Sequence, residues 1–524
     1  MLPSPSSSPT QPPRDVLHNR TNIHQESHGG GASIVKPRQN PSSYLPTPAK
    51  DASLKRPPSG LLVNTSRKRI KLKLQSDNEE GSDEGDEEMI ECAALRMQRT
   101  RWWKCYKNSG SLKALPILPT TSILRSYVSS NKSDIFRCQP IDDRYLAPLY
   151  ACSYSYGAKA GRTTHLAAST EQGVVHILDT RKRLDWDTEP QRSTFHIHTT
   201  GIYDVKWSPS DSRLATCSAD QSLKITDVTS TSALHTLRGH LGAVKCLAWH
   251  PQHEHVLSSG SRDGNIHLWD LRVGENRLQG QSLSPVATIT GAHDGLGYNP
   301  RRAKSATVRE SVTNVIYGEN MTLISSGSTD GILRSWDLRF TTETKKGRSA
   351  KNKRTLALIS SPLDPTTLHT SRRPRGILSL ASGTNSTGGL MFALGADTRI
   401  HTYSTQSLTA LPNSYTHPNM KTNSSFYLSI SASPCGRWLA SGSAEMRAFI
   451  FDVSNAAAPY TRAEPGIELR GQQLGDVGTV DWADGMLATG ADDGTIRVWR
   501  PDIEVYKSCL EEPAEKRWDW SWAA

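Results

Sequence analysis

The stretch from residue 239 to residue 272 restricts the fold of this chain more than any other. It begins with Gly239-His240, ends with Trp269-Asp270-Leu271-Arg272, and places Asp263-Gly264 between two runs of alternating apolar residues. Alternation with a period of two is typical of β-strands buried on one face, and Asp-Gly favours a tight turn between such strands. The histidine, the turn aspartate and the tryptophan can form one chain of hydrogen bonds across the strands. The stretch therefore predicts one antiparallel unit of a repeated β-structure.

The same pattern recurs along the chain. The turn position of Asp263 is equivalent to Gln172, Asp220, Asp330, Asp397, Glu445 and Asp493. Subtraction gives spacings of 48, 43, 67, 67, 48 and 48 residues, and four of these lie near the roughly 40–45 residues of a WD-repeat blade. The tryptophan position is held by Leu178, Thr226, Trp269, Trp336, Tyr403, Phe451 and Trp499. Seven copies predict an all-β fold, a seven-bladed WD-repeat β-propeller over residues 143–524, with two long insertions.

The loop histidine recurs at His198, His240 and His293 and is absent from the later copies, which we expect to rely on apolar packing. The last residues, RWDWSWAA, place Trp518, Trp520 and Trp522 at alternate positions, so that one face of a strand would carry all three. A closed ring has no exposed sheet edge. We therefore interpret this segment as a strand that helps the two ends of the chain to close the last blade.

The part of the chain before the propeller has a different composition. Residues 1–91 are rich in proline, serine and charge and poor in aromatics, which predicts disorder. They contain an acidic block, residues 77–91, preceded by a basic run made of Arg67, Lys68, Arg69, Lys71 and Lys73. The basic run predicts nuclear import, and therefore the nucleus, with a solvated basic tract as the alternative. Residues 92–142 are interpreted as a linker that either lies on the propeller or docks a partner.

Composition and motifs favour a binding protein. The net charge of +11 favours acidic partners or nucleic acid, and the 8 cysteines form no Cys-x-x-Cys pair. There is no apolar run long enough to span a membrane and no signal peptide, so we expect an intracellular, soluble protein without membrane contact. Phosphate-loop, nucleophile-elbow and zinc-protease motifs are missing. The group His250, His253, Glu254 and His255 falls in a turn and is interpreted as solvated rather than as a metal site. We expect no enzyme activity, no metal and no cofactor.

Two consecutive blades end in the same four-residue motif, Trp269-Asp270-Leu271-Arg272 and Trp336-Asp337-Leu338-Arg339. Tandem motifs of this kind are similar to those of the substrate receptors of cullin-4 ubiquitin ligases. The resemblance implies that Arg272 and Arg339 bind the ligase adaptor, the damaged-DNA-binding protein large subunit. It also places Trp269, Asp270, Trp336 and Asp337 in this adaptor-binding site. The alternative is that each arginine only caps local carbonyl groups.

Longer segments resemble the denticleless family in their order along the chain. These are APLYACSYS at 147–155, Gly291-Ala292-His293 followed by a basic insertion, NSSFYLSISASPCGRWLASGSAE at 423–445, and the closing SWAA. The chain is identified as a fungal-type member with an N-terminal extension, and we expect no C-terminal extension like that of animal members. The resemblance implies a non-catalytic receptor that recruits degron-bearing substrates on the replication sliding clamp for replication- and damage-coupled ubiquitination and degradation. The alternative is a nuclear WD-repeat scaffold for chromatin or complex assembly.

Two predicted loops carry seven cations. The strand order of a WD repeat places these loops on the propeller face opposite Arg272 and Arg339. The cations are Arg301, Arg302, Lys304, Arg309, Arg372, Arg373 and Arg375. A cluster of cations can contact DNA phosphates or an acidic clamp surface. We hypothesise that this patch steers the chain to clamp-loaded DNA while the nearby ring mouth reads the degron; the alternative is two solvated loops.

Overall fold

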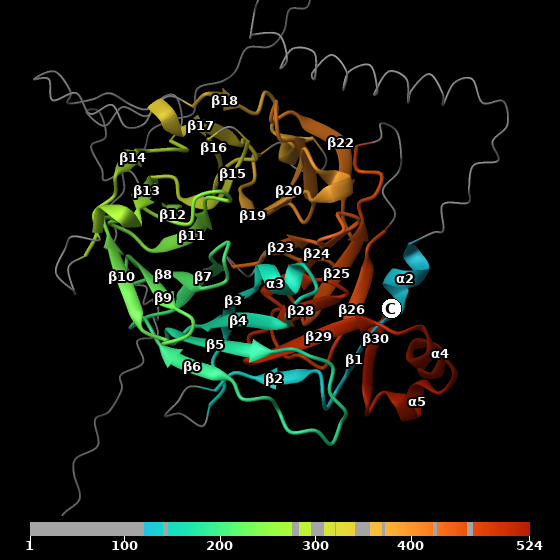
Figure 1. The fold of residues 1–524 in the computed structure, drawn as a ribbon. Coiled ribbons are helices and arrows are strands. Elements are labelled where there is room, and N and C mark those ends of the chain that lie inside the picture. Colours follow the sequence, from blue (N-terminus) through green and yellow to red (C-terminus); the bar gives the residue numbers. More distant parts are fainter. Residues whose placement is uncertain are drawn as a thin grey trace, which may run out of the picture. The chain divides into compact units, whose positions relative to one another are not determined.

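The structure is a computed structural model that describes residues 120–139, 145–274, 282–294, 309–319, 321–340, 357–368, 373–422, 427–457 and 465–524. The predicted import signal lies outside these residues, as do Arg301, Arg302, Lys304 and Arg372. The described part consists almost entirely of short antiparallel strands (Figure 1). This confirms the predicted all-β class.

Five sheets contain four strands each, in chain order across the sheet. The first two are formed by β3 (Leu149–Tyr154), β4 (His165–Thr170), β5 (Val174–Asp179) and β6 (Ser193–His196), and by β7 (Ile202–Trp207), β8 (Arg213–Ser218), β9 (Ser222–Asp227) and β10 (Ala233–Arg238). The third is formed by β11 (Val244–Trp249), β12 (Val256–Ser261), β13 (Ile266–Asp270) and β14 (Ala287–Ile289). The fourth and fifth are formed by β15 (Val312–Tyr317), β16 (Thr322–Gly327), β17 (Arg334–Asp337) and β18 (Ile359–Ser360), and by β19 (Ile377–Ser382), β20 (Leu390–Gly395), β21 (Ile400–Ser404) and β22 (Ala410–Tyr415).

A sixth sheet of ten strands joins the two ends of the described chain. It contains β23 (Ile430–Ala432), β24 (Trp438–Ser443), β25 (Arg447–Asp452) and β26 (Ile467–Arg470), and then β27 (Thr479–Ala483), β28 (Met486–Gly490) and β29 (Thr495–Pro501). Two N-terminal strands, β1 (Tyr127–Ser130) and β2 (Ile135–Arg137), pair with β29, and the C-terminal strand β30 (Trp520–Ala523) lies between β26 and β1. The predicted closure by both ends of the chain is confirmed.

The first strands of the repeats form a closed ring. Among the described strands, β3, β7, β11, β15, β19, β23 and β27 each contact the next, and β27 contacts β3. This arrangement is consistent with the seven blades predicted from the sequence. The spaces between neighbouring sheets are filled by buried aliphatic and aromatic side chains, so each sheet buries one face against the sheet before it and the other against the sheet after it. The Asp263-Gly264 turn is tight: Gly264 has φ +77°, and an added Cβ would lie 2.9 Å from the Glu310 carbonyl oxygen.

One boundary expectation was wrong. Residues 127–137 are predicted from the sequence as part of the linker, but they form β1 and β2, and all four residues of β1 are buried. Strands of three or four residues are too short for their periodicity to be recognised. A second difference concerns the tail, because Trp518 precedes β30 and is 81% exposed. The buried face of β30 carries Ser521 and Ala523 instead of the tryptophans.

Helices are short and lie in connections. The α-helices of the described residues are α2 (Thr121–Arg125), α3 (Tyr156–Lys159), α4 (Ile503–Glu511) and α5 (Pro513–Lys516). The 3-10 turns are η1 (Leu271–Gly274), η2 (Leu338–Phe340), η3 (Pro365–Thr367) and η4 (Asn385–Thr387). Asp502 caps α4 by accepting a hydrogen bond from the backbone N–H of Val505. None of these helices is long and apolar enough to cross a bilayer.

Candidate partner-binding surfaces

The two Trp-Asp-x-Arg motifs form matching turns at the ends of β13 and β17. In the first turn, Asp270 Oδ1 accepts hydrogen bonds from the Arg272 backbone N–H at 3.1 Å and from Arg272 Nε at 3.0 Å, while Arg272 Nη2 donates to Asp270 Oδ2 at 2.6 Å. In the second turn, the corresponding distances between Arg339 and Asp337 are 3.0, 3.0 and 2.7 Å. Each aspartate therefore fixes both the turn and the plane of the guanidinium group.

These turns display the arginines rather than burying them. The Arg272 and Arg339 side chains are 63% and 62% exposed. The hydrogen bond from Arg272 holds the pKa of Asp270 below its usual value, and the hydrogen bond from Arg339 does the same for Asp337. Exposed ion pairs of this kind contribute little to stability. The arrangement instead preorganises two planar cations for a partner that offers carboxylate or carbonyl oxygens.

The tryptophans of the motifs lie inside their sheets. Trp269 Nε1 donates to Ser259 Oγ at 2.9 Å, and Ser259 Oγ lies 2.7 Å from His240 Nε2. His240 Nδ1 lies 3.2 Å from Asp263 Oδ2. The hydrogen-bonded chain predicted from the sequence is confirmed, with Ser259 as its additional member. Because Trp269 and Trp336 are almost fully buried, they position the strand end and do not present a contact surface.

In the fourth and last sheets, the tryptophan takes part in a similar series of hydrogen bonds with different partners. In the fourth, Trp336 Nε1 and His293 Nε2 each lie 2.9 Å from Ser325 Oγ, and the buried Nδ1 of His293 has no partner among the described residues. In the last, Trp499 Nε1 donates to Thr489 Oγ1 at 3.0 Å, which donates to Gln473 Oε1 at 2.9 Å. For this sheet, the expectation of apolar packing in place of the histidine was wrong, because a glutamine amide accepts the same hydrogen bond.

Replacing His293 with glutamine should reduce the loss of stability in acid. Burial, with the charge of Arg334, lowers the pKa of His293 from 6.5 to about 3. The unfolded chain binds a proton at this position below about pH 6.5, but the folded chain does not. The stability contributed by the neutral histidine is therefore complete above pH 6.5 and falls with pH, by about 2 kcal/mol at pH 5. Urea unfolding of the wild type and of His293→Gln at pH 7 and pH 5 measures the difference.

Glutamine is the matched replacement because Gln473 makes the equivalent bond in the last sheet. His293→Gln should keep the link to Ser325, so its stability at pH 7 should stay close to that of the wild type. An equal loss of stability between pH 7 and pH 5 in the two proteins would contradict this account.

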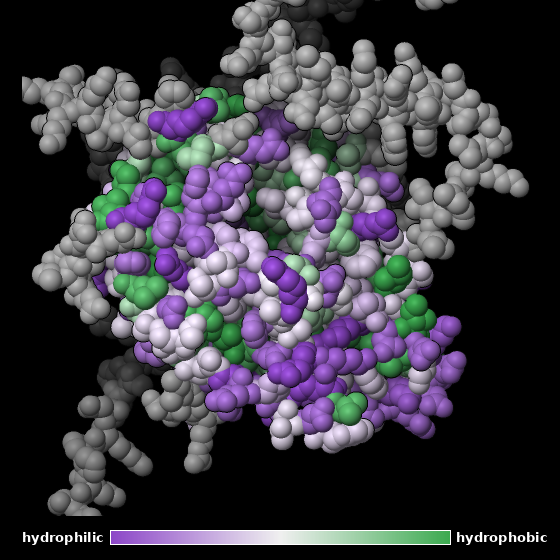
Figure 2. Space-filling view, viewed as in Figure 1, coloured by the Kyte–Doolittle hydropathy of each residue, from purple (hydrophilic) through white to green (hydrophobic). Residues whose placement is uncertain are grey.

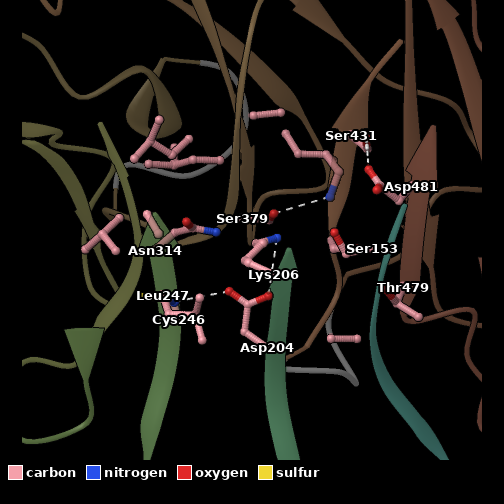
Figure 3. Close-up of a pocket in the computed structure, with 18 of the residues that line it drawn as sticks. Ser153, Asp204, Lys206, Cys246, Leu247, Asn314, Ser379, Ser431, Thr479 and Asp481 are labelled. Carbon is pink, nitrogen blue, oxygen red and sulfur yellow. Dashed lines mark hydrogen bonds and ion pairs between the residues drawn. The ribbon is translucent and has the colours of Figure 1, made fainter. Parts of the chain in front are cut away.

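A central channel lies inside the ring and is lined mainly by the first strands of the sheets. Its cavity volume is about 830 Å³, and Figure 2 shows the hollow in one face. Lys206 Nζ lies 3.3 Å from Asp204 Oδ1 (Figure 3), and Lys159 Nζ lies 3.1 Å from Asp481 Oδ2. Burial raises the pKa of Asp204, although the charge of Lys206 opposes this effect. The paired charges give the channel wall polar groups of both signs.

Tyrosines gather where the first strands begin. Tyr150 and Tyr203 stack with ring centroids 5.7 Å apart, and Tyr427 lies 4.9 Å from Tyr150. Lys245 Nζ lies 3.8 Å from the centre of the Tyr203 ring, a cation–π distance. These residues line the channel and give the predicted ring mouth an aromatic wall. The sequence pattern does not reveal this cluster, because its members belong to four different repeats.

Three of the seven predicted patch cations are described. Arg309 is exposed beside β15, and its Nη1 donates to Asn265 Oδ1 at 3.2 Å. Arg373 and Arg375 are exposed before β19. All three precede first strands, whereas Arg272 and Arg339 follow third strands. Antiparallel order puts these positions at opposite ends of the strands, as the sequence predicts.

Two histidine groups have the chemistry of metal ligands. In the turn after β11, His250 Nδ1 accepts hydrogen bonds from the backbone N–H groups of Gln252 and His253, and its Nε2 lies 3.2 Å from Met321 Sδ. In the second group, His240, Asp263 and His267 place their ligand atoms within 4.8 Å of one another. Both nitrogens of His240 already take part in the chain that ends at Trp269. His250 is buried and held by its backbone hydrogen bonds, so the expectation of a solvated group was wrong for this residue.

A closed ring of antiparallel sheets, with the complete Trp269–Ser259–His240–Asp263 chain in the third, defines this protein as a WD-repeat propeller. The WD domain, G-beta repeat family matches residues 189–227, 231–270 and 464–500. Denticleless protein homolog A of Xenopus laevis is 31% identical over 396 residues, which cover 72% of this chain and 51% of that protein. Cell division cycle protein cdt2 of Schizosaccharomyces pombe is 29% identical over 371 residues, 67% of this chain and 70% of that protein.

The human Denticleless protein homolog is 30% identical over 371 residues, 67% of this chain and 46% of that protein. The chain belongs to the denticleless family, as its sequence motifs predict. It spans about half the length of the animal relatives that it matches.

Proposed function

We propose that the chain is the non-catalytic substrate-recognition subunit of a cullin-4 ubiquitin ligase. The observation that carries this proposal is the pair of Asp–Arg turns, which repeat the same hydrogen bonds in adjacent sheets. Arg272 and Arg339 bind the ligase adaptor, the damaged-DNA-binding protein large subunit. Two rigidly held guanidinium groups suit acceptor oxygens on such a partner. Membership of the denticleless family supports this assignment.

The opposite end of the ring serves the substrate in this proposal. The tyrosine cluster at the channel mouth reads a degron, and the exposed Arg309, Arg373 and Arg375 approach the clamp-loaded DNA or the acidic clamp surface. The substrates are degron-bearing proteins on the replication sliding clamp. Their ubiquitination leads to degradation during replication and after damage. Binding of adaptor and substrate at opposite ends leaves both sites accessible at once.

Purification of the tagged full chain from cells tests this proposal. The cullin-4 adaptor should co-purify in stoichiometric amount, because a substrate receptor works only while it is bound to the ligase. A nuclear scaffold for chromatin or complex assembly would bring down other partners without the adaptor. Absence of the adaptor would therefore favour the scaffold function.

Replacing Lys68, Arg69, Lys71 and Lys73 with alanine should move a fluorescent fusion of the full chain from the nucleus to the cytoplasm. The expectation follows from the basic run, which import receptors recognise by its charge. Microscopy of the variant and the wild type measures the distribution. A matched control replaces four acidic residues of the block at 77–91 and should stay nuclear. Persistent nuclear signal in the basic-run variant would contradict the assignment.

A further inference from the structure

The first sheet contains a third Asp-x-Arg turn, formed by Asp179, Thr180 and Arg181 after β5. The Arg181 backbone N–H donates to Asp179 Oδ1 at 3.1 Å, and Arg181 Nε donates to Asp179 Oδ2 at 2.7 Å. Arg181 Nη2 forms an ion pair with the same oxygen at 2.5 Å. Partial burial raises the pKa of Asp179, but the hydrogen bonds from Thr164 and Arg181 together outweigh it and hold the pKa below its usual value. The aspartate thus holds both the backbone N–H and the guanidinium group of Arg181, although the guanidinium group contacts Oδ2 alone, whereas each tandem turn uses both carboxylate oxygens.

The three turns occupy the same place in their sheets. Each aspartate pairs with the first residue of the second strand: Asp179 with His165, Asp270 with Val256, and Asp337 with Thr322. The middle residue is buried, and its N–H donates to the carbonyl just before that strand: Thr180 to Thr164 at 2.9 Å, Leu271 to His255 at 2.8 Å, and Leu338 to Met321 at 3.0 Å. The turn after β5 does not match the Trp-Asp-x-Arg motif because Leu178 occupies the tryptophan position.

The arginine is not required to form such a turn. Asp227-Val228-Thr229 after β9 and Asp452-Val453-Ser454 after β25 make the same middle-residue hydrogen bond, from Val228 to Ser212 at 3.0 Å and from Val453 to Arg437 at 2.8 Å. Threonine and serine therefore suffice at the third position for the backbone to turn. A purely structural role does not explain why three sheets use arginine there.

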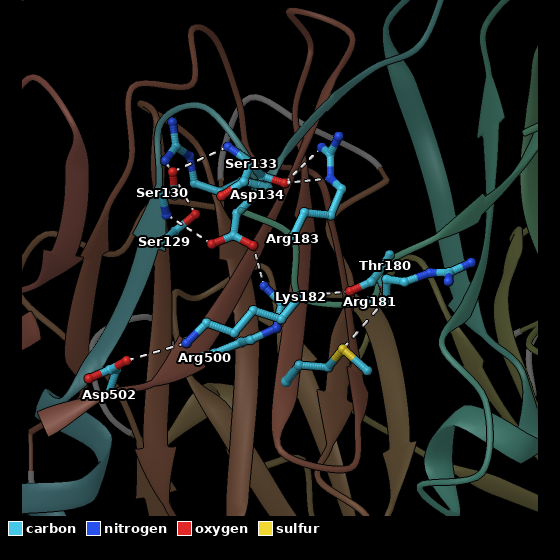
Figure 4. Close-up of polar contacts among 12 residues, drawn as sticks. Ser129, Ser130, Ser133, Asp134, Thr180, Arg181, Lys182, Arg183, Arg500 and Asp502 are labelled. Carbon is cyan, nitrogen blue, oxygen red and sulfur yellow. Dashed lines mark hydrogen bonds and ion pairs between the residues drawn. The ribbon is translucent and has the colours of Figure 1, made fainter. Parts of the chain in front are cut away.

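Among the three cations of the loop after β5, Arg181 is the one whose side chain extends into solvent beyond its own turn. Its side chain is 65% exposed. The next two residues are engaged: Lys182 Nζ lies 3.5 Å from Asp502 Oδ2, and Arg183 donates to the Ser133 carbonyl at 3.1 and 2.7 Å. Figure 4 shows these two side chains directed toward Asp502 and Ser133, with Arg181 pointing away from them. The loop is thereby anchored, and Arg181 extends into solvent.

Arg500, in β29, also anchors this loop. Its guanidinium group contacts the Asp134 carboxylate and the Thr180 carbonyl oxygen (Figure 4). The Arg181 turn is thus fixed against β1, β2 and β29 rather than left to move. A preorganised side chain loses less conformational entropy on binding than a mobile one.

We propose that Arg181 is a third contact to the ligase adaptor, so that the adaptor spans the first, third and fourth sheets. The inference rests on the proposed function of Arg272 and Arg339. All three arginines follow third strands, so they lie at the same end of their strands, with the second sheet between the first and the third. The recognising chemistry is the same at each turn: a planar cation, held by an aspartate, that meets carboxylate or carbonyl oxygens of the adaptor.

The test measures the Kd of the purified full chain for the purified adaptor. Arg181→Ala should weaken binding roughly 5- to 30-fold, the effect of removing one well-placed interface arginine. Thr229→Ala changes the same turn position in the second sheet and should stay within about twofold of the wild type. The unfolding temperatures of both variants should match the wild type, because the altered side chains are exposed. Asp179→Asn keeps the arginine but weakens the hydrogen bonds that position it, so the loss of adaptor affinity should be intermediate.

A second measurement does not depend on affinity. A photo-crosslinking amino acid at position 181 should capture the adaptor, whereas the same group at position 229 should capture much less. If the wild type and Arg181→Ala bind equally well and position 181 gives no crosslink, the third contact is wrong while the proposed function stands. If the wild type itself does not bind the adaptor, both fail.

Discussion

Replacing Arg272 and Arg339 together with alanine should reduce binding of the cullin-4 adaptor by at least about 100-fold, because central arginines often dominate an interface. Each guanidinium group donates two hydrogen bonds to its own aspartate, so its position is set before the partner arrives. Both side chains are more than half exposed, and their surface ion pairs contribute little to folding. The unfolding temperature should therefore change little while co-purification of the adaptor is lost.

Two further variants separate charge from geometry. Thr229 and Ser454 hold the same turn position in sheets that lack the arginine, so Thr229→Ala with Ser454→Ala is the matched control and should bind normally. Arg272→Lys with Arg339→Lys keeps both charges but cannot make the planar, two-pronged contact, and should bind weakly. Undiminished co-purification by the alanine variant would contradict the assignment. A large fall in unfolding temperature would instead support arginines that cap local carbonyl groups.

The repeated part of the fold could be predicted because one physical pattern recurs. A strand pair buried on one face, a tight Asp-Gly turn and a tryptophan that donates to a serine must all fall at fixed spacings. The stretch from 239 to 272 meets each condition, and its hydrogen-bonded chain exists as predicted. The ends of the third strands were predictable for the same reason, which located Arg272 and Arg339.

Other features follow from contacts between residues that are distant in sequence. β1 and β2 belong to the last sheet although more than 350 residues separate Ser129 from Arg497, and nothing local in their few residues marks them as strands. The tyrosines at the channel mouth come together only once the ring is closed. Gln473 and Leu178 depart from the consensus residue type yet occupy its position, so a pattern based on residue identity misses both the last hydrogen-bonded chain and the turn of Arg181.

Deleting residues 518–524 should produce the largest loss of stability among these changes, about 3–5 kcal/mol or more in unfolding free energy. The deletion removes β30, which pairs with β26 on one side and with β1 on the other. It therefore exposes two strand edges at once and uncovers the core beside Leu469, which pairs with the buried Ala523. Urea unfolding of the deleted and full chains measures the effect.

A buried arginine makes the last sheet sensitive to the loss of β30. Arg497 is 1% exposed, and burial lowers its pKa to about 10. Its Nη1 donates to Asn131 Oδ1 at 2.9 Å, to Ser521 Oγ at 3.2 Å and to Ser129 Oγ at 3.3 Å, which links β29 to both ends of the chain. Loss of Ser521 takes away one acceptor from a buried cation, and such groups are costly to leave without partners.

The tail offers its own control. Trp518 precedes β30 and is 81% exposed, so Trp518→Ala should change the unfolding free energy by less than about 0.5 kcal/mol. If the deletion were as mild as this substitution, β1 paired with β29 would suffice to close the ring, and β30 would be an accessory strand. If Trp518→Ala were as damaging as the deletion, the tryptophan face predicted from the sequence would be the stabilising one. A large effect of the deletion with a small effect of the substitution assigns closure to the β26–β30–β1 pairing and to the hydrogen bonds of Arg497.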